Sequence, residues 1–354
     1  MNVSVIIPFY NAQETLGQCL EGLALQEVRP FEIILIDNGS TDQSLAVIRK
    51  AQQETGLPLV MASEVKRGPG PARNRGISLA RGELVAFLDA DCVAQPDWIR
   101  NIEAVFDQDP SLGAVGGIED SVGRSLTTLM GAFLAVCWIG PSWEFRRVEI
   151  TDKGDWLGDK YIPTFNSVYR KDLLSALGGF DESFFPAGED IDLWMRALDQ
   201  KARLVAWEPR LVVQHLQEIT LRKLLQKSWE YINAAGHLAR RHFSCRCIIQ
   251  LTGTRALKCS LPRGTVILRR GFVKGWGLVA FLGLAAFLAP VFGVLVLVGI
   301  LGFYFFRLNT RIRRKGYRGG LAANFVFLYI FLAREAVEFA ASFWFSLKYR
   351  LIIY

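Results

Sequence analysis

Cysteine and histidine are scarce in this sequence, which narrows the kinds of site that it can build. The 354 residues include 6 cysteines and 3 histidines, and no two cysteines form a Cys-x-x-Cys pair. Scattered residues of this kind predict neither a disulfide framework nor a structural zinc site. We therefore expect the thiols to be reduced.

Proline is also scarce, with 13 residues, whereas 51% of the residues are hydrophobic. This composition excludes a collagen-like chain and an intrinsically disordered one, because it is sufficient to bury a core. Residues 1–10 lack the basic segment and the long apolar run of a secretory signal peptide. We therefore expect the front of the chain to stay in the cytoplasm.

Acidic residues are nearly absent from the C-terminal part of the chain. Residues 221–354 contain 3 Asp and Glu against 21 Lys and Arg, whereas residues 1–220 contain 31 against 20. The net charge of +7 thus hides an acidic front and a basic, apolar back. Basic charge beside long apolar runs is typical of attachment to an anionic membrane surface rather than of nucleic-acid binding.

One long run, residues 275–306, has no charged side chain. As a single helix it would extend about 48 Å, which exceeds the roughly 30 Å of the hydrocarbon core. Pro290 near its middle favours a hairpin or a kinked, tilted helix, and basic residues on both flanks favour a hairpin with both ends in the cytoplasm.

The sequence therefore predicts a protein of the inner (cytoplasmic) membrane. We expect a basic helical linker at the membrane surface over 221–271 and a membrane region over 272–354. Within that region we expect a hairpin over 273–306 and a further apolar helix over 321–347. The last helix either pairs with the hairpin or lies in the interface.

The first 120 residues alternate short apolar runs with helical patterns, which indicates an α/β domain with a mostly parallel sheet. The expected strands are 3–8, 31–36, 59–62, 83–88 and 114–116, and the expected helices lie near 13–25, 42–54, 70–80 and 96–107. A mixed α+β half follows to residue 219. In such sheets ligands bind beyond the carboxyl ends of the strands, so the residues there are candidate site residues.

Two carboxylates, Asp89 and Asp91, follow one apolar strand. Their spacing points both side chains to the same side of an extended segment. Two hard oxygen donors suit Mg²⁺ or Mn²⁺ that carries a substrate diphosphate. A capped turn before the helix at Pro96 is the alternative.

The segments 36–42 and 68–76 also follow strands. In the first, Ser40 and Gln43 are typical of a helix capping box, which leaves Asp37 free to accept hydrogen bonds from a base or a ribose. The second opens a helix whose N-terminus, with Arg73 nearby, could face a phosphate. Surface arginines after a proline-rich cap are the alternative for the second segment.

Three acids, Glu189, Asp190 and Asp192, lie at the start of a predicted helix. One acid at a helix N-terminus needs no function, because the helix dipole stabilises it. Three beside the apolar loop 184–187 favour an acid/base role, since a carboxylate in a partly apolar pocket can take a proton from a hydroxyl. His215 ends a strand, and a lone histidine is usually a structural group rather than a ligand.

In this order, the segments resemble glycosyltransferase family 2 with the GT-A fold. The resemblance covers about residues 1–220 and rests on the segments 3–11, 36–42, 72–76, 87–91, 178–182 and 188–190. It implies an inverting GT-A catalytic domain over 1–220. The basic tail resembles that of bacterial members that work on envelope glycans or glycolipids, which implies transmembrane helices after the domain.

The resemblance also implies a nucleotide-sugar site and a metal, Mg²⁺ or Mn²⁺. The residues that it implies for the nucleotide sugar are Pro8, Tyr10, Asn11, Asp37, Arg73, Asp89 and Asn166. Among these, Arg73 would lie near the phosphates and Asn166 would line the cleft between donor and acceptor. The implied metal ligands are Asp91, Asp89 and His215.

For the chemistry, the resemblance implies that Asp190 is the catalytic base and that Glu189 orients the acceptor. The donor would be a nucleotide-diphosphate sugar, with UDP favoured, and the acceptor a hydroxyl of a lipid-linked or envelope glycan. Gln226-Lys227-Ser228-Trp229 lacks the arginine of the Gln-x-x-Arg-Trp motif of processive members, which favours addition of a single sugar. Two alternatives stay open: a polyprenyl-phosphate acceptor, and a catalytically silent, membrane-anchored nucleotide-sugar-binding protein.

Overall fold

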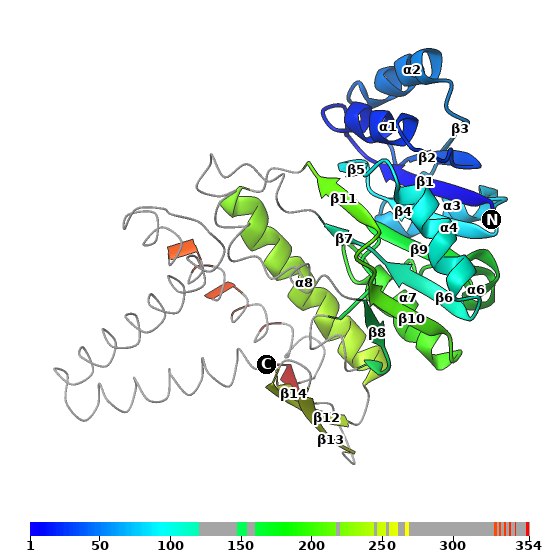
Figure 1. Cartoon of the computed structure of the whole chain (residues 1–354). Helices are drawn as coiled ribbons and strands as arrows, with labels where there is room; N and C mark the ends of the chain where they lie inside the picture. Colours follow the sequence, from blue (N-terminus) through cyan, green and yellow to red (C-terminus); the bar gives the residue numbers. More distant parts are fainter. Residues whose placement is uncertain are drawn as a thin grey trace, which may run out of the picture. The chain divides into compact units, whose positions relative to one another are not determined.

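The computed structural model describes residues 1–119, 147–153, 160–216, 220–243, 246–252, 255–260 and 266–268, with scattered positions from 329 to 353 (Figure 1). The chain divides into two compact units. The first consists of Met1–Gly123 with Gly140–Gln217, and the second of Arg124–Ile139 with Glu218–Tyr354.

The first unit is built on an eight-stranded sheet in the order β3-β2-β1-β4-β9-β6-β10-β8. Its strands are β1 (Val3–Phe9), β2 (Glu32–Asp37), β3 (Leu59–Ser63), β4 (Leu84–Leu88), β6 (Leu112–Gly116), β8 (Val148–Ile150), β9 (Asn166–Arg170) and β10 (Arg203–Trp207). Only β9 and β8 run antiparallel to their neighbours. The expected α/β class with a mostly parallel sheet is thus confirmed.

The central strands are continuous apolar runs because helices cover both faces of the sheet. Every residue of β4 is buried, and so is nearly every residue of β1. The connecting helices are α1 (Leu16–Ala24), α2 (Ser44–Thr55), α3 (Pro69–Leu79) and α4 (Trp98–Gln108), all close to the expected ranges. Gly76 lets α3 approach β1, because a Cβ there would overlap Cγ2 of Ile6.

The expected capping box at Ser40 and Gln43 is wrong. The hydroxyl of Ser40 accepts the backbone N–H of Asn11 at 3.1 Å instead. The helix α2 begins at Ser44, whose N–H donates to Oδ1 of Asp42 at 3.0 Å. A long-range partner for Ser40 therefore replaced the local one that the spacing suggested.

A small sheet beside the large one positions the ends of three segments that are far apart in the sequence. It consists of β5 (Cys92–Ala94), β11 (Val212–His215) and β7 (Ile118–Glu119), in the order β5-β11-β7. The helices α6 (Lys171–Leu177) and α7 (Glu189–Asp199) complete the unit. Both ends that matter for the site, the start of β5 and the end of β11, meet because β11 runs antiparallel to β5.

In the second unit the structure describes α8 (Leu221–His242), before which the hydroxyl of Thr220 accepts the N–H of Lys223. The strands β12 (Arg246–Thr252), β13 (Arg255–Ser260), β14 (Val266–Leu268) and β15 (Ile352–Ile353) then form a sheet in the order β13-β12-β14-β15. Within the linker expected over 221–271, the residues that the structure describes are helical over 221–242 and form strands over 246–252, 255–260 and 266–268. The later part of the linker contains β-branched residues that favour strands.

Among the described residues, no helix is both long enough and apolar enough to span a membrane. The hairpin expected over 273–306 lies outside the described residues. In the range 321–347 the structure describes only scattered positions, which are helical.

Candidate active site

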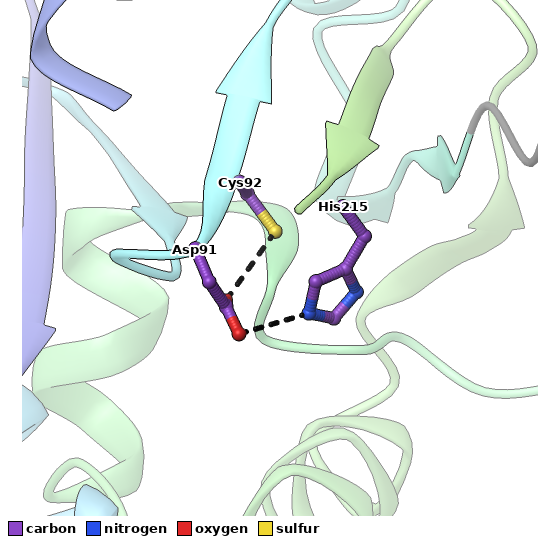
Figure 2. Close-up of side chains that lie close together, drawn as sticks. All are labelled: Asp91, Cys92 and His215. Carbon is purple, nitrogen blue, oxygen red and sulfur yellow. Dashed lines mark hydrogen bonds and ion pairs between the residues drawn. The ribbon is translucent and has the colours of Figure 1, made fainter. Parts of the chain in front are cut away.

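Asp91 and His215 come together from neighbouring strands of the small sheet. Asp91 directly precedes β5, and the register places His215, at the end of β11, opposite Cys92. Nε2 of His215 lies 3.2 Å from Oδ2 of Asp91, and Figure 2 shows the two side chains facing each other. Glu119 of β7 lies 3.7 Å from the other ring nitrogen, Nδ1. The imidazole is thus held between two carboxylates.

Three side chains of this cluster offer donor atoms to a metal ion. Those of Asp91, Cys92 and His215 all lie within 4.8 Å of one another. Burial and the charges of Asp91 and Asp89 raise the pKa of the Cys92 thiol well above its usual value. A thiol is also a soft ligand, whereas Mg²⁺ and Mn²⁺ are hard ions that prefer oxygen donors. Asp91 and His215 therefore fit a divalent ion, whereas Cys92 does not.

The same imidazole also attracts a proton. Burial disfavours the charged form of His215, but the hydrogen bond and charge of Asp91, with the charge of Glu119, outweigh it and raise its pKa. Metal binding needs the neutral ring, so a proton and a metal compete for Nε2.

Arg73 of α3 joins two of the expected site carboxylates. Its Nη1 donates to Oε1 of Glu189 at 2.7 Å, and its Nη2 donates to Oδ1 of Asp89 at 2.9 Å. Burial disfavours the guanidinium charge, but these carboxylates raise its pKa above the ordinary value. The side chain is 5% exposed. The structure therefore shows Arg73 engaged with protein carboxylates at the place where the resemblance implied phosphates.

Glu189 and Asp190 open α7 side by side. Burial and the charge of Asp190 raise the pKa of Glu189 to about 7, although Arg73 opposes the rise. Burial also raises the pKa of Asp190, against the charge of Arg73 and the N–H of Ile191, which donates to Oδ1 at 2.8 Å. A carboxylate with a raised pKa accepts a proton more readily. The start of α7 can therefore act as a base.

The residues expected at the nucleoside lie near the carboxyl ends of β1 and β2, where Pro8 and Asp37 belong to the strands and Tyr10 and Asn11 to the exposed loop after β1. Pro8 lies in β1 beside Ile36 of β2. The side chain of Asn11, whose φ is 49°, accepts the N–H of Thr41 at 2.8 Å. Oδ1 of Asp37 accepts the N–H of Ser40 at 2.9 Å. Hydrogen bonds thus hold the two loops together, while Tyr10 remains 51% exposed.

We compared the chain with known protein families and known proteins. Residues 4–178 match the model of Glycosyl transferase family 2. The chain contains a glycosyltransferase family 2 domain. An uncharacterised glycosyltransferase of Nostoc sp. is 34% identical over 183 residues, which cover 51% of this chain and 54% of the Nostoc protein. The chain thus spans about half the length of this relative.

One further protein sequence and one solved structure are similar to this chain. The poly(ribitol-phosphate) beta-N-acetylglucosaminyltransferase of Staphylococcus aureus is 32% identical over 110 residues, or 30% of this chain and 19% of that protein. A mannosyltransferase from Pyrobaculum calidifontis, solved with GDP-Man and Mn²⁺, superposes with a TM-score of 0.60 at 18% identity, covering 92% of this chain and 86% of that chain. At this identity the likeness concerns the fold, and it supports the GT-A type for this glycosyltransferase domain.

Asn166 does not line a cleft in this glycosyltransferase domain. Its side chain is 0% exposed. Its Oδ1 accepts the indole N–H of Trp98 at 2.9 Å, and its Nδ2 donates to the carbonyls of Ile118 and Leu211. The expectation of a donor and acceptor contact is therefore corrected: this amide joins β9 to α4, β7 and the segment before β11.

Two asparagines for which the sequence predicted no role hold backbone segments of the glycosyltransferase domain together by hydrogen bonds. Asn38 bonds the carbonyls of Glu64 and Lys66 through Nδ2 and the N–H of Gly68 through Oδ1. Asn74 bonds both the N–H and the carbonyl of Phe180. Each occurs in a segment of the resemblance, so its presence in a motif was the available signal. The partners of Asn38 lie 26 to 30 residues away, and Phe180 lies 106 residues from Asn74. Spacing along the sequence therefore could not predict these partners.

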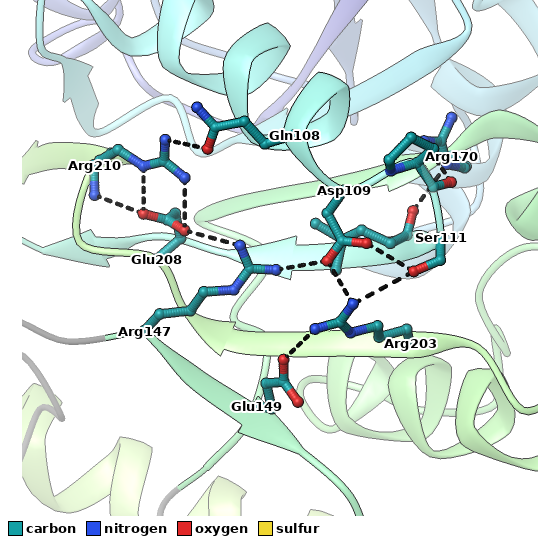
Figure 3. Close-up of polar contacts among 11 residues, drawn as sticks. Gln108, Asp109, Ser111, Arg147, Glu149, Arg170, Arg203, Glu208 and Arg210 are labelled. Carbon is teal, nitrogen blue, oxygen red and sulfur yellow. Dashed lines mark hydrogen bonds and ion pairs between the residues drawn. The ribbon is translucent and has the colours of Figure 1, made fainter.

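A second polar cluster ties the far edge of the large sheet (Figure 3). Asp109 accepts Nη2 of Arg147 at 3.0 Å and pairs with Nη1 of Arg203 at 2.9 Å. Glu208 accepts Nε of Arg210 at 2.8 Å. These pairs connect β8 and β10 to the start of β6, and the described site residues named above take no part in them. The cluster stabilises the edge rather than the active site.

Proposed function

We propose that this chain is an inverting glycosyltransferase that moves a sugar from a nucleotide-diphosphate sugar to a hydroxyl of a lipid-linked or envelope glycan. We further propose that the reaction depends on Mg²⁺ or Mn²⁺ and adds a single sugar. The observation that carries this proposal is the meeting of Asp91 with His215 at one strand end, in the same domain as buried Arg73, which pairs with Glu189 and Asp89.

The proton step rests on Asp190. The acceptor hydroxyl loses its proton to this carboxylate, and its oxygen attacks the anomeric carbon from the face opposite the nucleotide, which inverts the configuration in one displacement. The raised pKa of Asp190 suits this role, because burial makes the carboxylate a stronger base. Arg73 holds Glu189 beside it and fixes the start of α7.

The nucleotide diphosphate leaves with the bonding electrons of the broken bond. A divalent ion held by Asp91 and His215, with Asp89 as a further carboxylate, would offset the charge that develops on this leaving group. An imidazole ligand favours Mn²⁺ over Mg²⁺. The Pyrobaculum mannosyltransferase, which was solved with GDP-Man and Mn²⁺, supports a nucleotide sugar and a divalent ion here.

For the acceptor we propose a hydroxyl on a glycan or a related polymer at the cytoplasmic face of the inner membrane. The Staphylococcus relative is named for transfer to poly(ribitol phosphate), which supports a polymer of the envelope. The membrane location rests on the basic charge of residues 221–354 and on the uncharged run 275–306.

The test is Asp190→Asn in the full-length chain. We expect donor binding to persist and transfer to fall by about 10²–10⁴-fold, which is the usual contribution of a general base. Donor binding is measured by calorimetry with Mn²⁺, and transfer by release of the nucleoside diphosphate over a panel of glycan acceptors. Unchanged turnover would remove Asp190 from the mechanism and favour an already ionised acceptor such as a polyprenyl phosphate.

A further inference from the structure

Arg67 lies where the chain passes from β3 to α3, and it differs from the other cations of that segment. Lys66 pairs with Oε2 of Glu182 at 2.6 Å, and Arg73 pairs with Asp89 and Glu189. Arg67 is exposed and has no carboxylate partner among the residues that the structure describes. Among these three cations, Arg67 is thus the one whose charge no described carboxylate neutralises.

The guanidinium of Arg67 lies over a residue of the nucleoside end. Its Cζ is 4.3 Å from the centroid of the Tyr10 ring, an arrangement that cation–π attraction favours. It also lies beside Gly39, where φ is 83° and where an added Cβ would be 3.6 Å from Cζ. Arg67 therefore spans the loops that follow β1 and β2.

The backbone on both sides of Arg67 is fixed by a buried side chain. Asn38, which is 8% exposed, accepts the N–H of Gly68 at 2.9 Å and donates to the carbonyl of Lys66 at 2.8 Å. The exposed guanidinium therefore extends from a backbone segment, residues 66–68, that Asn38 holds in place at both ends. Such a position limits the conformational entropy that binding would cost.

The charges of the site indicate what the guanidinium of Arg67 can bind. Asp37, Asp89 and Asp91 at the strand ends and Asp190 at the start of α7 make the site acidic, and a nucleoside diphosphate that enters it is itself a multiply charged anion. Arg73 is already bonded to two carboxylates. A planar guanidinium suits phosphate oxygens, because it can donate two parallel hydrogen bonds.

We propose that Arg67 is a donor-binding residue that leaves the face of Tyr10 and bonds the diphosphate of the nucleotide sugar. This inference rests on the proposed function. It assigns to Arg67 the phosphate contact that the sequence implied for Arg73.

The test compares nucleoside diphosphates with nucleosides on the full-length chain. UDP, GDP and dTDP, each with Mn²⁺, are first titrated into the unsubstituted protein by calorimetry to find the diphosphate that binds. That diphosphate and its nucleoside are then titrated into Arg67→Ala, Arg67→Lys and Arg75→Ala. Arg75 is the matched control, because it is an exposed arginine on α3.

We expect Arg67→Ala to weaken diphosphate binding by about tenfold to a hundredfold, as for loss of a charged hydrogen-bonding group. Nucleoside binding should be unchanged, Arg67→Lys should fall between, and Arg75→Ala should match the unsubstituted protein. Equal losses for diphosphate and nucleoside would overturn the assignment and place Arg67 against the base. Unchanged binding of both would also overturn it.

The failure of the proposed function is seen separately. If no nucleoside diphosphate binds the unsubstituted protein while its thermal unfolding remains cooperative, the donor site itself is wrong, and the assignment of Arg67 falls with it. If the unsubstituted protein binds and transfers normally but Arg67→Ala does not differ from it, only the Arg67 inference is wrong.

Discussion

The two ends of the site hold their side chains in different ways. At the nucleoside end, exposed loops after β1 and β2 are joined by hydrogen bonds between side chains and backbone, as between Asn11 and Thr41. At the catalytic end, the buried guanidinium of Arg73 bonds buried Glu189 and partly exposed Asp89. Burial makes an unpaired charge costly. Substitutions at the catalytic end should therefore reduce both stability and activity, whereas those at the nucleoside end should reduce mainly binding.

The sharpest way to break this comparison is Arg73→Met. The substitution leaves Glu189 buried without its cation, so we expect the free energy of unfolding to fall by about 3–5 kcal/mol. Urea unfolding of the full-length chain measures this, with Arg75→Met on the exposed face of the same helix as the control. Equal stability of the two variants would show that the buried pairs contribute little.

The next largest effect is expected for Asn166→Ala, behind the catalytic end. The substitution leaves the indole N–H of Trp98 and the carbonyls of Ile118 and Leu211 without their partner. We expect a loss of about 2–4 kcal/mol in unfolding free energy, since each unsatisfied buried group costs about 1–3 kcal/mol. Donor affinity of the folded fraction, measured by calorimetry, should not change. A large drop in donor affinity at unchanged stability would restore Asn166 to the cleft.

His215→Ala should separate function from stability at the same end. The imidazole is a candidate metal ligand, so we expect affinity for Mn²⁺ to fall at least about tenfold, in line with the losses seen when even the outer partners of a metal site are removed. The measurement is a Mn²⁺ titration followed by electron paramagnetic resonance. Cys92→Ala is the control and should bind Mn²⁺ as the unsubstituted protein does, because a soft sulfur donor is a poor ligand for this hard ion. Weaker binding by the Cys92 variant alone would reverse the ligand assignment.

The smallest effect on stability is expected at the nucleoside end, for Asn11→Ala. The substitution removes the acceptor for the N–H of Thr41 and places alanine at a φ of 49°. Both losses occur on an exposed loop, so we expect about 1 kcal/mol in thermal or urea unfolding. Donor affinity should fall more clearly than stability. A loss of stability as large as that of Arg73→Met would erase the difference between the two ends.

Much of the first unit could be predicted from the sequence, because strands that are covered on both faces consist of continuous runs of apolar residues. The segments around Val3–Phe9 and Leu84–Leu88 were found almost to the residue. The capping box at Ser40 was wrong because a partner distant in the sequence, Asn11, competes for the same hydroxyl. A helical linker was expected over 221–271, whereas β-branched residues favour the strands that the structure describes there after residue 245.

Only part of the candidate site could be predicted from the sequence, because contacts between residues distant in the sequence decide the rest. Asp89, Asp91, Glu189 and Asp190 lie at element ends, so position along the chain identified them. The partners of Arg73 could not be foreseen, since α3, β4 and α7 meet only in the fold. The burial of Asn166 likewise depends on four separate elements and on no local pattern.

By itself the sequence determined the α/β class, the acidic and basic division of the chain, and the carboxylates available for chemistry, because hydrophobic periodicity and charge are local properties. The tertiary structure decided which of those groups act together: it joined Asp91 to His215, engaged Arg73 with carboxylates and left Arg67 uncommitted. The physical reason is that desolvation and Coulomb attraction depend on distance and burial. Neither quantity is set until distant strands pair.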